Sequence, residues 1–359
     1  MNKKQLLSAF RNINGSVLIG IDGYVDEVWN LVQSRNEKKE AVLYTHMKQY
    51  ADRIYNAAGG GMAVEIVRKR RSYGGFTANT GNAVTTLGID TTMLCLFGAD
   101  TIDSVFEPFE QSCKVISIGN PSLTHIFEFD DGKVMLPYEE NTNKTSWHKL
   151  INDLGEDALT QLLVQSELVA LGYWACMPDF DNIITEICQC LKHSSKTKRI
   201  FLDFADVGKK SIDSLKQVFP LLNKLNNSTP ITLSMNEHEA AVVCSLYDIA
   251  LNAKQAPEPT QIESLHKQIG IDEIVVHTPW YALAATTQEG VSIKKQNYCE
   301  KPVRTTGAGD TFNGGYISSI MAGLPIEDRL DFANRVVYYF LANGVAPELE
   351  DILNTLPTE

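Results

Sequence analysis

The chain has 359 residues, of which 44% are hydrophobic and 21% charged, and its formal net charge is -12. This balance is typical of a folded globular protein and excludes an intrinsically disordered chain. A net negative charge repels nucleic acid and anionic membranes, and no stretch approaches the ~20 apolar residues of a membrane span, so we expect neither partner.

The cysteines and the N-terminal residues indicate a compartment. The seven cysteines are odd in number and scattered along the chain, which argues against a disulfide framework and fits a reducing environment. The residues before Val17 lack the long apolar core of a secretory signal. We therefore expect a cytoplasmic protein.

The first half of the sequence predicts one buried strand and a flap. Residues 16–20 form a continuous apolar run of the kind found in buried strands. Between residues 33 and 73 a polar, helix-like stretch precedes an alternating run at 62–67, and residues 124–137 form a second alternating pair around a turn. Alternation indicates half-exposed strands, so these two excursions predict a small β lid outside the main sheet.

From about residue 165 onward, short apolar runs alternate with amphipathic stretches. We predict strands at 168–172, 199–203, 231–235 and 273–277, and helices at 179–193, 211–225, 237–250 and 260–269. Continuous apolar strands flanked by helices indicate a parallel sheet covered on both faces. No linker or repeat divides the chain, so the predicted fold class is α/β, a doubly wound, mostly parallel sheet flanked by helices, in one domain over residues 1–359.

A glycine-rich turn near the C-terminus is the strongest candidate for chemistry. Gly307, Ala308 and Gly309 precede a helix-like stretch, and such a turn directs unpaired N–H groups and the positive helix end at one point. This is an anion hole suited to a phosphoryl group. Asp310 follows in the first helical turn, where the helix dipole favours its ionised form, and it could accept a proton from an attacking alcohol. The alternative is a tight turn followed by an Asp that merely starts a helix.

The common nucleotide-binding fingerprints are missing from the sequence. There is no Gly-x4-Gly-Lys-Ser/Thr motif, and residues 307–312 lack the last glycine of the dinucleotide motif. A phosphate group must therefore be held in another way.

Two N-terminal segments carry residues that suit a hydroxylated ligand. Gly74 and Gly75 allow a ligand to approach the backbone closely, and Asn79 offers both a donor and an acceptor. Asp26, just beyond the first strand, could accept hydrogen bonds from two sugar hydroxyls. Plain turns would explain the same residues.

A third segment pairs Asn236 with Glu239 where a strand hands over to a helix. The spacing is that of a helix-capping pattern, which gives both residues a structural role. The alternative is a carboxylate at the C-terminal end of a strand that orders Mg²⁺ through water beside nucleotide phosphates.

Taken together and in this order, these segments resemble the ribokinase-like PfkB family of carbohydrate kinases across nearly the whole chain. Thr306–Phe312 matches the specific family signature Thr-Gly-Ala-Gly-Asp-x-Phe. The resemblance implies roles for individual residues: Asp310 as catalytic base; Gly307, Ala308 and Gly309 as anion hole; Asp26, Gly74, Gly75 and Asn79 as the sugar site; Asn236, Thr278 and Asn334 as the nucleotide site; and Glu239 as a partner of Mg²⁺ through water.

The resemblance also implies ATP and Mg²⁺ as cofactors, a small sugar-like substrate and, as in many members, a homodimer formed through the lid. The implied function is transfer of the γ-phosphate of ATP to a hydroxyl of a sugar or sugar derivative. A nucleoside kinase of the same fold and a catalytically quiet sugar-binding relative remain alternatives. The sequence leaves the identity of the sugar open.

Three features depart from the family pattern. Arg304 stands where the family usually has an Asp that helps to bind K⁺, so its permanent positive charge speaks against K⁺ activation. Thr278 to Ala282 replaces a Gly-x-x-Gly turn that shapes the nucleotide pocket, and the interval between Asp26 and Gly74 is unusually long.

One basic run, residues 68–71, precedes the paired glycines. Such a run is usually a solvated face. The alternative is that one or two of its side chains reach into the pocket and pair with an anionic group on the substrate.

Overall fold

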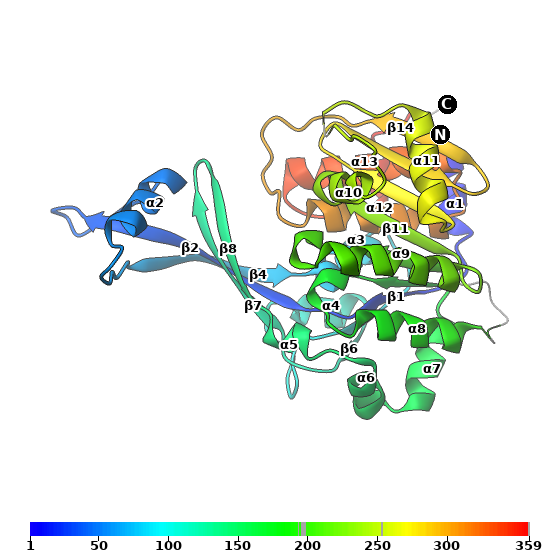
Figure 1. The fold of residues 1–359 in the computed structure, drawn as a ribbon, viewed down its shortest axis with the longest axis horizontal. Coiled ribbons are helices and arrows are strands. Elements are labelled where there is room, and N and C mark those ends of the chain that lie inside the picture. Colours follow the sequence, from blue (N-terminus) through cyan, green and yellow to red (C-terminus); the bar gives the residue numbers. More distant parts are fainter. Residues whose placement is uncertain (193, 195–198, 253, 358–359) are drawn as a thin grey trace.

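The computed structural model describes residues 1–192, 194, 199–252 and 254–357. Figure 1 shows a body built around one large sheet, from which a long β arm projects to one side. The N-terminus and the C-terminus lie near each other on the body, on the side away from the arm.

The main sheet has nine strands in the order β14-β13-β12-β11-β10-β9-β1-β5-β6. Their bounds are β1 (Val17–Gly20), β5 (Thr91–Cys95), β6 (Lys114–Ser117), β9 (Leu168–Leu171), β10 (Arg199–Asp203), β11 (Ile231–Asn236), β12 (Glu273–His277), β13 (Tyr281–Thr286) and β14 (Gly290–Lys295). The pairs from β6 to β12 are parallel, and β13 and β14 add an antiparallel edge. The α/β, mostly parallel architecture is confirmed.

Helices cover both faces of this sheet. One face carries α1 (Lys3–Arg11), α3 (Phe76–Thr86), α12 (Ala308–Met321), α13 (Ile326–Asn343) and α14 (Leu349–Leu353). The other carries α6 (Trp147–Leu154), α7 (Glu156–Gln165), α8 (Phe180–Leu191), α9 (Ile212–Asn226), α10 (Glu237–Ser245) and α11 (Pro259–Ile269). The short α4 (Glu107–Ser112) and α5 (Glu140–Asn143) and the 3-10 turns η1 (Trp174–Cys176) and η2 (Val207–Lys209) complete the body.

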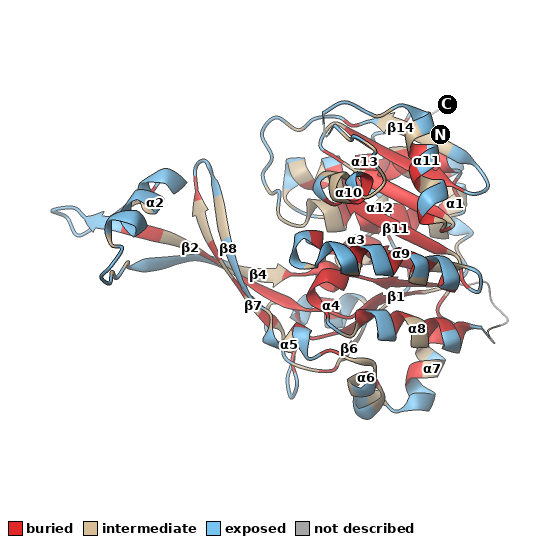
Figure 2. Cartoon of the chain, in the orientation of Figure 1, coloured by how far each residue is buried: buried red, intermediate tan, exposed pale blue. Residues whose placement is uncertain are grey.

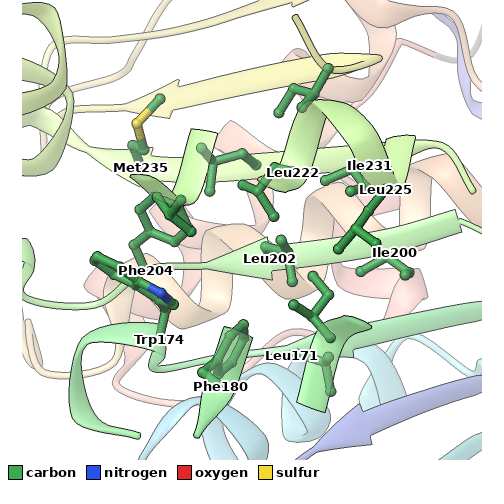
Figure 3. Close-up of a cluster of buried hydrophobic side chains, with 14 of the residues drawn as sticks. Leu171, Trp174, Phe180, Ile200, Leu202, Phe204, Leu222, Leu225, Ile231 and Met235 are labelled. Carbon is green, nitrogen blue, oxygen red and sulfur yellow. The ribbon is translucent and has the colours of Figure 1, made fainter. Parts of the chain in front are cut away.

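Alternation along the strands explains the two-sided core. In β1, Val17 and Ile19 pack with the α3 and α12 side, whereas Leu18 packs with the α8 and α9 side. Figure 3 shows part of the cluster on the α8 and α9 side, in which Leu202 and Phe204 lie between helix and strand side chains. The central strands of the main sheet are buried, and the outer helix faces are exposed (Figure 2). Within the described residues, no helix is long and apolar enough to cross a membrane.

The arm is a second sheet of five strands, with α2 (Met47–Asn56) at its tip (Figure 1). Its strands are β2 (Tyr24–Arg35), β3 (Ala41–Leu43), β4 (Ile66–Gly74), β7 (Ser122–Phe129) and β8 (Gly132–Tyr138). A small cluster around Leu31, Tyr44 and Phe129 stabilises it. The arm corresponds to the lid expected at 33–73 and 124–137, but it begins earlier, at Tyr24.

Several predicted boundaries differ from the structure. The alternating strand expected at 62–67 begins at Ile66 and continues to Gly74, so the basic run lies inside a strand. The helix expected over 237–250 ends at Ser245. The helix expected over 179–193 ends at Leu191, and residue 193 lies outside the described residues.

Candidate active site

The glycine-rich turn adopts the shape that an anion hole needs. Gly307 has φ +87° and caps α12, and a Cβ atom there would lie 3.0 Å from Oδ1 of Asn79, so only glycine fits. The Ala308 amide donates 3.1 Å to the Thr305 carbonyl, whereas the amides of Gly309 and Asp310 have no hydrogen-bond partner within the described residues. The latter two N–H groups are therefore the ones available to an anion.

Asp310 is held from the side by α3. Nδ2 of Asn79 donates a 3.0 Å hydrogen bond to Oδ2 of Asp310, and the Thr80 hydroxyl donates to the Asp310 carbonyl at 3.1 Å. Burial, together with the negative charges of Asp203 and Asp22, raises the pKa of Asp310 to about 8. The expectation that the helix dipole keeps this carboxyl ionised is thus outweighed by desolvation and like charges.

Asp26 lies inside the lid strand β2, rather than in a turn after β1, and is buried. Burial raises the pKa of Asp26, and a hydrogen bond with Thr124 and the positive charges of Arg304 and Lys133 partly oppose the shift. The carboxylate lines a cavity of about 510 Å³, called the first cavity below, so the lid itself carries a candidate sugar-binding group.

The paired glycines act differently from one another. Gly75 lines the cavity and has φ +90°, and a Cβ atom there would lie 2.2 Å from Oδ2 of Asp22. Gly74 pairs with Tyr24 in the ladder between β4 and β2 and is not among the residues that line the cavity. A Cβ atom at Gly74 would lie 2.6 Å from Oδ2 of Asp26, so this glycine leaves room for that carboxylate.

The sequence analysis did not identify Asp22 as a site residue. Its carboxylate accepts 2.8 Å hydrogen bonds from the amides of Phe76 and Thr77 and a bond from the Thr77 hydroxyl at 2.5 Å, so it caps α3 from the end of β1. The only local signal is an Asp directly after a buried strand, since its partners lie more than fifty residues away.

Asn236 and Glu239 form a complete capping box at the start of α10. The backbone N–H of Asn236 donates to Oε2 of Glu239 at 3.0 Å, and Oδ1 of Asn236 accepts from the backbone N–H groups of His238 and Glu239. Both residues also line the first cavity. Burial, followed by the charge of Asp203, raises the pKa of Glu239 well above its usual value. The capping role and the cavity position therefore coexist.

Asp203 is a second site residue that sequence reasoning missed. It ends β10, lines the cavity, and accepts a 2.8 Å hydrogen bond from Nδ2 of Asn313, whose Oδ1 accepts from the Ser234 hydroxyl. Burial raises the pKa of Asp203 to about 6. This buried network ties α12 to the ends of two strands.

Two cavities meet at the turn. The first has a volume of about 510 Å³ and is lined by Asp26, Asn79 and Asp310 among others; the second has about 550 Å³. They share five lining residues, namely Asn236, His277, Thr305, Ala308 and Gly309. A group held in one cavity can therefore reach the other across the unpaired amides.

The second cavity has an apolar wall made by Pro279, Phe312, Val337 and Leu341. Its turn closes without the expected glycines, because the Thr278 hydroxyl donates to the Tyr281 carbonyl and accepts from the amides of Trp280 and Tyr281. The Thr278 side chain is therefore used within the protein, although the residue still lines the cavity.

Asn334 is not among the residues that line either cavity. It lies buried in α13, and its Oδ1 atom has no hydrogen-bond partner among the residues that the structure describes. The structure thus does not bring it together with the other predicted nucleotide residues.

His277 is another residue that the sequence did not point to. It ends β12 at the junction of the two cavities, with its ring 4.9 Å from the ring of Phe312. Burial lowers the pKa of His277 to about 4, so the imidazole is neutral at physiological pH.

Arg304 turns inward beside the turn. Its guanidinium carbon lies 5.7 Å from the centre of the Tyr73 ring and 5.4 Å from that of Phe340, and Nε donates 3.1 Å to the Thr306 carbonyl. A permanent positive charge is thereby fixed next to the anion hole.

The basic run on β4 is paired with carboxylates. Arg71 binds Asp103 in two hydrogen bonds of 2.8 and 2.6 Å, and Arg70 lies 3.6 Å from Glu128. No residue of 68–71 is among those that line either cavity. The hypothesis that this run binds an anionic substrate group therefore receives no support.

Comparisons with known proteins point in one direction. A family model described as prokaryotic ketohexokinase matches residues 3–358. The ketohexokinase of Haloferax volcanii is 23% identical over 345 residues, which cover 94% of this chain and 90% of that protein.

Solved structures agree on the fold. Ribokinase of Arabidopsis thaliana, complexed with ribose and ATP, matches with a TM-score of 0.66 at 15% identity over 95% of this chain and 98% of that one. Ribokinase of Cryptococcus neoformans, in complex with ADP, matches with a TM-score of 0.65 at 16% identity over 96% and 100%.

Proposed function

Because the chain belongs to the prokaryotic ketohexokinase family and is a sugar kinase, we propose that it transfers the γ-phosphate of ATP to a hydroxyl of a small sugar, with Asp310 as the general base. Membership of this family sets aside the nucleoside kinase and the catalytically quiet binding protein as alternatives.

One observation carries the proposal: two cavities of ligand size share a wall at the turn that holds Gly309 and Asp310. Asp310 lines only the first cavity, and the apolar wall belongs to the second. A sugar in the first cavity and a nucleotide in the second would therefore meet at the unpaired amides.

The chemistry follows from this arrangement. The sugar hydroxyl oxygen attacks the γ-phosphorus in line, the bond to the β–γ bridging oxygen breaks, and ADP leaves. The hydroxyl proton passes to the Asp310 carboxylate, whose raised pKa makes it a stronger base than an ordinary Asp. The amides of Gly309 and Asp310 hydrogen-bond the phosphoryl oxygens as negative charge develops.

In the first cavity, Asp26 and Asn79 are the proposed sugar-binding side chains, and the Gly75 backbone forms part of the wall. Asn79 also orients Asp310. A sugar that bridges Asp26 and Asn79 would thus place its acceptor hydroxyl beside the base.

In the second cavity, Asn236 and Thr278 are the proposed nucleotide contacts. Because the Thr278 hydroxyl is engaged in its turn, we assign its contact to the backbone and the methyl group. Asn334 lines neither cavity, so we assign it no contact with the nucleotide.

The residues present suit a Mg²⁺ ion. Burial raises the pKa values of Glu239 and Asp203, and the charge of Asp203 raises that of Glu239 further, so a cation bound beside them would be favoured. No cluster of three His, Cys, Asp or Glu residues among those described could by itself hold a metal, so water and nucleotide oxygens would complete the shell. Mg²⁺ bound beside Glu239 would neutralise phosphate charge.

The Arg304 guanidinium replaces a monovalent cation in this proposal. It binds the Thr306 carbonyl and carries its charge permanently, which K⁺ would otherwise supply to the same loop.

The lid is proposed both to cover the sugar and to form a homodimer. Lys133 reaches from β8 to the Thr306 hydroxyl at 2.6 Å, so the lid already contacts the anion-hole loop. Of the fourteen large hydrophobic residues that are exposed in the described part of the chain, nine lie on the lid: Val42, Met47, Ile54, Tyr55, Ile66, Val67, Met135, Leu136 and Tyr138. A second copy of the lid would cover such a surface.

We also propose a cytoplasmic location. All seven cysteines are free thiols, as a reducing compartment requires.

The test is ADP formation from ATP in the presence of ketoses, aldoses, sugar acids, sugar phosphates and nucleosides. We expect turnover with a neutral sugar, and ketohexoses are the first candidates. Turnover restricted to nucleosides, or none with any sugar, would refute the proposal.

A further inference from the structure

A cluster of polar side chains in the first cavity has no role in the proposed mechanism. It consists of Tyr24, Glu139, Cys176 and Lys209. None of the four lines the second cavity, so the cluster belongs to the sugar side alone.

The cluster is centred on an ion pair. Nζ of Lys209 lies 2.6 Å from Oε1 of Glu139, the Tyr24 hydroxyl donates to the same oxygen at 3.4 Å, and Nζ also lies 3.5 Å from Sγ of Cys176. The side chains of Glu139 and Lys209 are 18% and 34% exposed, so the pair is largely shielded but open to the cavity. Two of the three ammonium protons are thereby used, and one remains for a ligand.

The pair joins the lid to the body. Glu139 directly follows the lid strand β8, whereas Lys209 lies in η2, just after β10. Cys176 comes from η1, after β9. The ion pair therefore fixes the distance between the lid and the body at this part of the cavity.

The charge of the cavity lining makes the pair distinctive. Among the described residues that line the first cavity, six are carboxylates (Asp26, Asp203, Asp206, Glu139, Glu239 and Asp310) and Lys209 is the one Lys or Arg. Because Glu139 neutralises that lysine, this end of the cavity offers hydrogen bonds but no net positive charge.

We propose that the Glu139–Lys209 ion pair determines acceptor specificity: it binds sugar hydroxyl groups other than the one that attacks the phosphate, and it rejects a phosphate group at that position. The inference rests on the proposed function, which it deepens. A neutral hydroxyl can accept from Lys209 and donate to Glu139 at once. A phosphate would meet the carboxylates of Glu139 and Asp206 with no unpaired cation to compensate.

The two members of the pair predict different changes. Glu139→Gln frees the Lys209 cation, so discrimination between fructose and fructose 6-phosphate, measured as the ratio of kcat/KM values, should fall at least tenfold. Lys209→Met removes the donor, so KM for fructose should rise about tenfold while kcat changes less than threefold. KM for ATP should stay the same in both variants.

Neighbouring residues supply matched controls. Glu140→Gln and Lys210→Met change residues of the same types, each directly after a member of the pair. Glu140 forms an ion pair with Lys144, and Nζ of Lys210 lies 5.2 Å from the centre of the Trp174 ring. Neither lines the cavity, and neither should change KM or discrimination by more than twofold. Lys209→Arg, which keeps the charge, should restore most of the affinity lost in Lys209→Met.

Direct binding separates this inference from the proposed function. Calorimetric titration of fructose and fructose 6-phosphate into each variant, without ATP, reports the pair even if turnover is absent. The pair does not determine acceptor specificity if the wild type turns over sugars and both variants behave like the controls. In that outcome Glu139→Gln discriminates, and Lys209→Met binds fructose, within twofold of the controls. If the wild type turns over no sugar, the proposed function fails instead.

Discussion

The side-chain amide of Asn79 donates a 3.0 Å hydrogen bond to the carboxylate of Asp310, joining α3 to α12 at the point where the two cavities meet. A donor in this position favours the charged form of the carboxyl and therefore opposes the larger effect of burial on its pKa. The hydrogen bond between Asn79 and Asp310 therefore positions the base and affects the pH at which it is active.

Asp310→Asn should reduce kcat by at least the ~10²–10⁴-fold expected when a general base is lost. Asp213→Asn, an exposed Asp in the first turn of α9, is the matched control and should leave kcat unchanged. More than a tenth of wild-type turnover under chemistry-limited conditions would show that Asp310 is not the base.

The same variant also has an expected effect on stability. The pKa of Asp310 is higher in the folded chain than in the unfolded one, so this group favours folding below about pH 4, and that contribution is lost as pH rises towards about 8. At pH 7 the group is ionised in the unfolded chain but still protonated in the folded one, which lowers the stability by on the order of 4 kcal/mol relative to low pH. Asp310→Asn removes this cost, so its Tm at pH 7 should equal or exceed that of the wild type; a lower Tm would contradict the argument.

The pH dependence of kcat/KM follows from the same pKa. Because the base must be deprotonated, kcat/KM should rise with pH through about 8. Asn79→Ala removes the hydrogen bond that lowers the pKa, so its acid limb should move to higher pH. Asn82→Ala, on the same helix, should keep the wild-type profile. An acid limb that does not move in Asn79→Ala would count against the assigned interaction.

Glu239→Gln separates helix capping from metal chemistry. Gln preserves a capping box, so α10 and the Tm should be kept. Loss of the carboxylate should raise the Mg²⁺ concentration for half-maximal activity at least tenfold. Asp351→Asn, in the capping box of α14, is the control. An unchanged Mg²⁺ titration would leave Glu239 with its capping role alone.

Arg304 predicts indifference to K⁺. A second cation 4 Å from the guanidinium would meet a repulsion of roughly 4 kcal/mol at an effective dielectric constant near 20, which exceeds the ~1.4 kcal/mol of a tenfold change in affinity. Activity should therefore be the same in K⁺ and in a bulky ammonium salt at equal ionic strength, and Arg304→Asp should create a K⁺ requirement. Clear activation of the wild type by K⁺ would contradict the proposed role.

The lid dimer can be tested by sedimentation. Tyr55→Ser combined with Leu136→Ser removes two of the most exposed apolar side chains of the lid and should weaken association at least tenfold. The control pair is Val345→Ser with Tyr338→Ser, which are exposed on the body. A wild-type chain that sediments as a monomer at micromolar concentration would refute the dimer.

The sequence predicted those parts of the site that depend on local geometry. Gly307 to Asp310 could be interpreted because a turn and the first turn of a helix involve neighbouring residues only. Asp203 and His277 could not, since they become site residues only when β10 and β12 align their C-terminal ends in one sheet.

The lid shows the same limit. Its first strand, β2, continues the chain almost directly from the buried β1, so no change in composition marks where the body ends and the lid begins. The alternating pattern was visible only farther out, where one face meets solvent. The sequence therefore indicates only that Asp26 follows the first strand, whereas the structure places it inside the next one.

The central position of β1 has a consequence for how the chain folds during synthesis. β1 pairs with β5 on one side and β9 on the other, through Gly20 with Leu94 and with Leu171. At a translation rate of about 5–20 residues per second, β9 follows β5 after roughly 4–15 s, because about 75 residues separate them. During this interval one edge of a buried, apolar strand has no partner, which is a template for unwanted pairing between nascent chains. Truncation after residue 160 should therefore give an aggregating product, whereas extension past Leu171 should reduce aggregation.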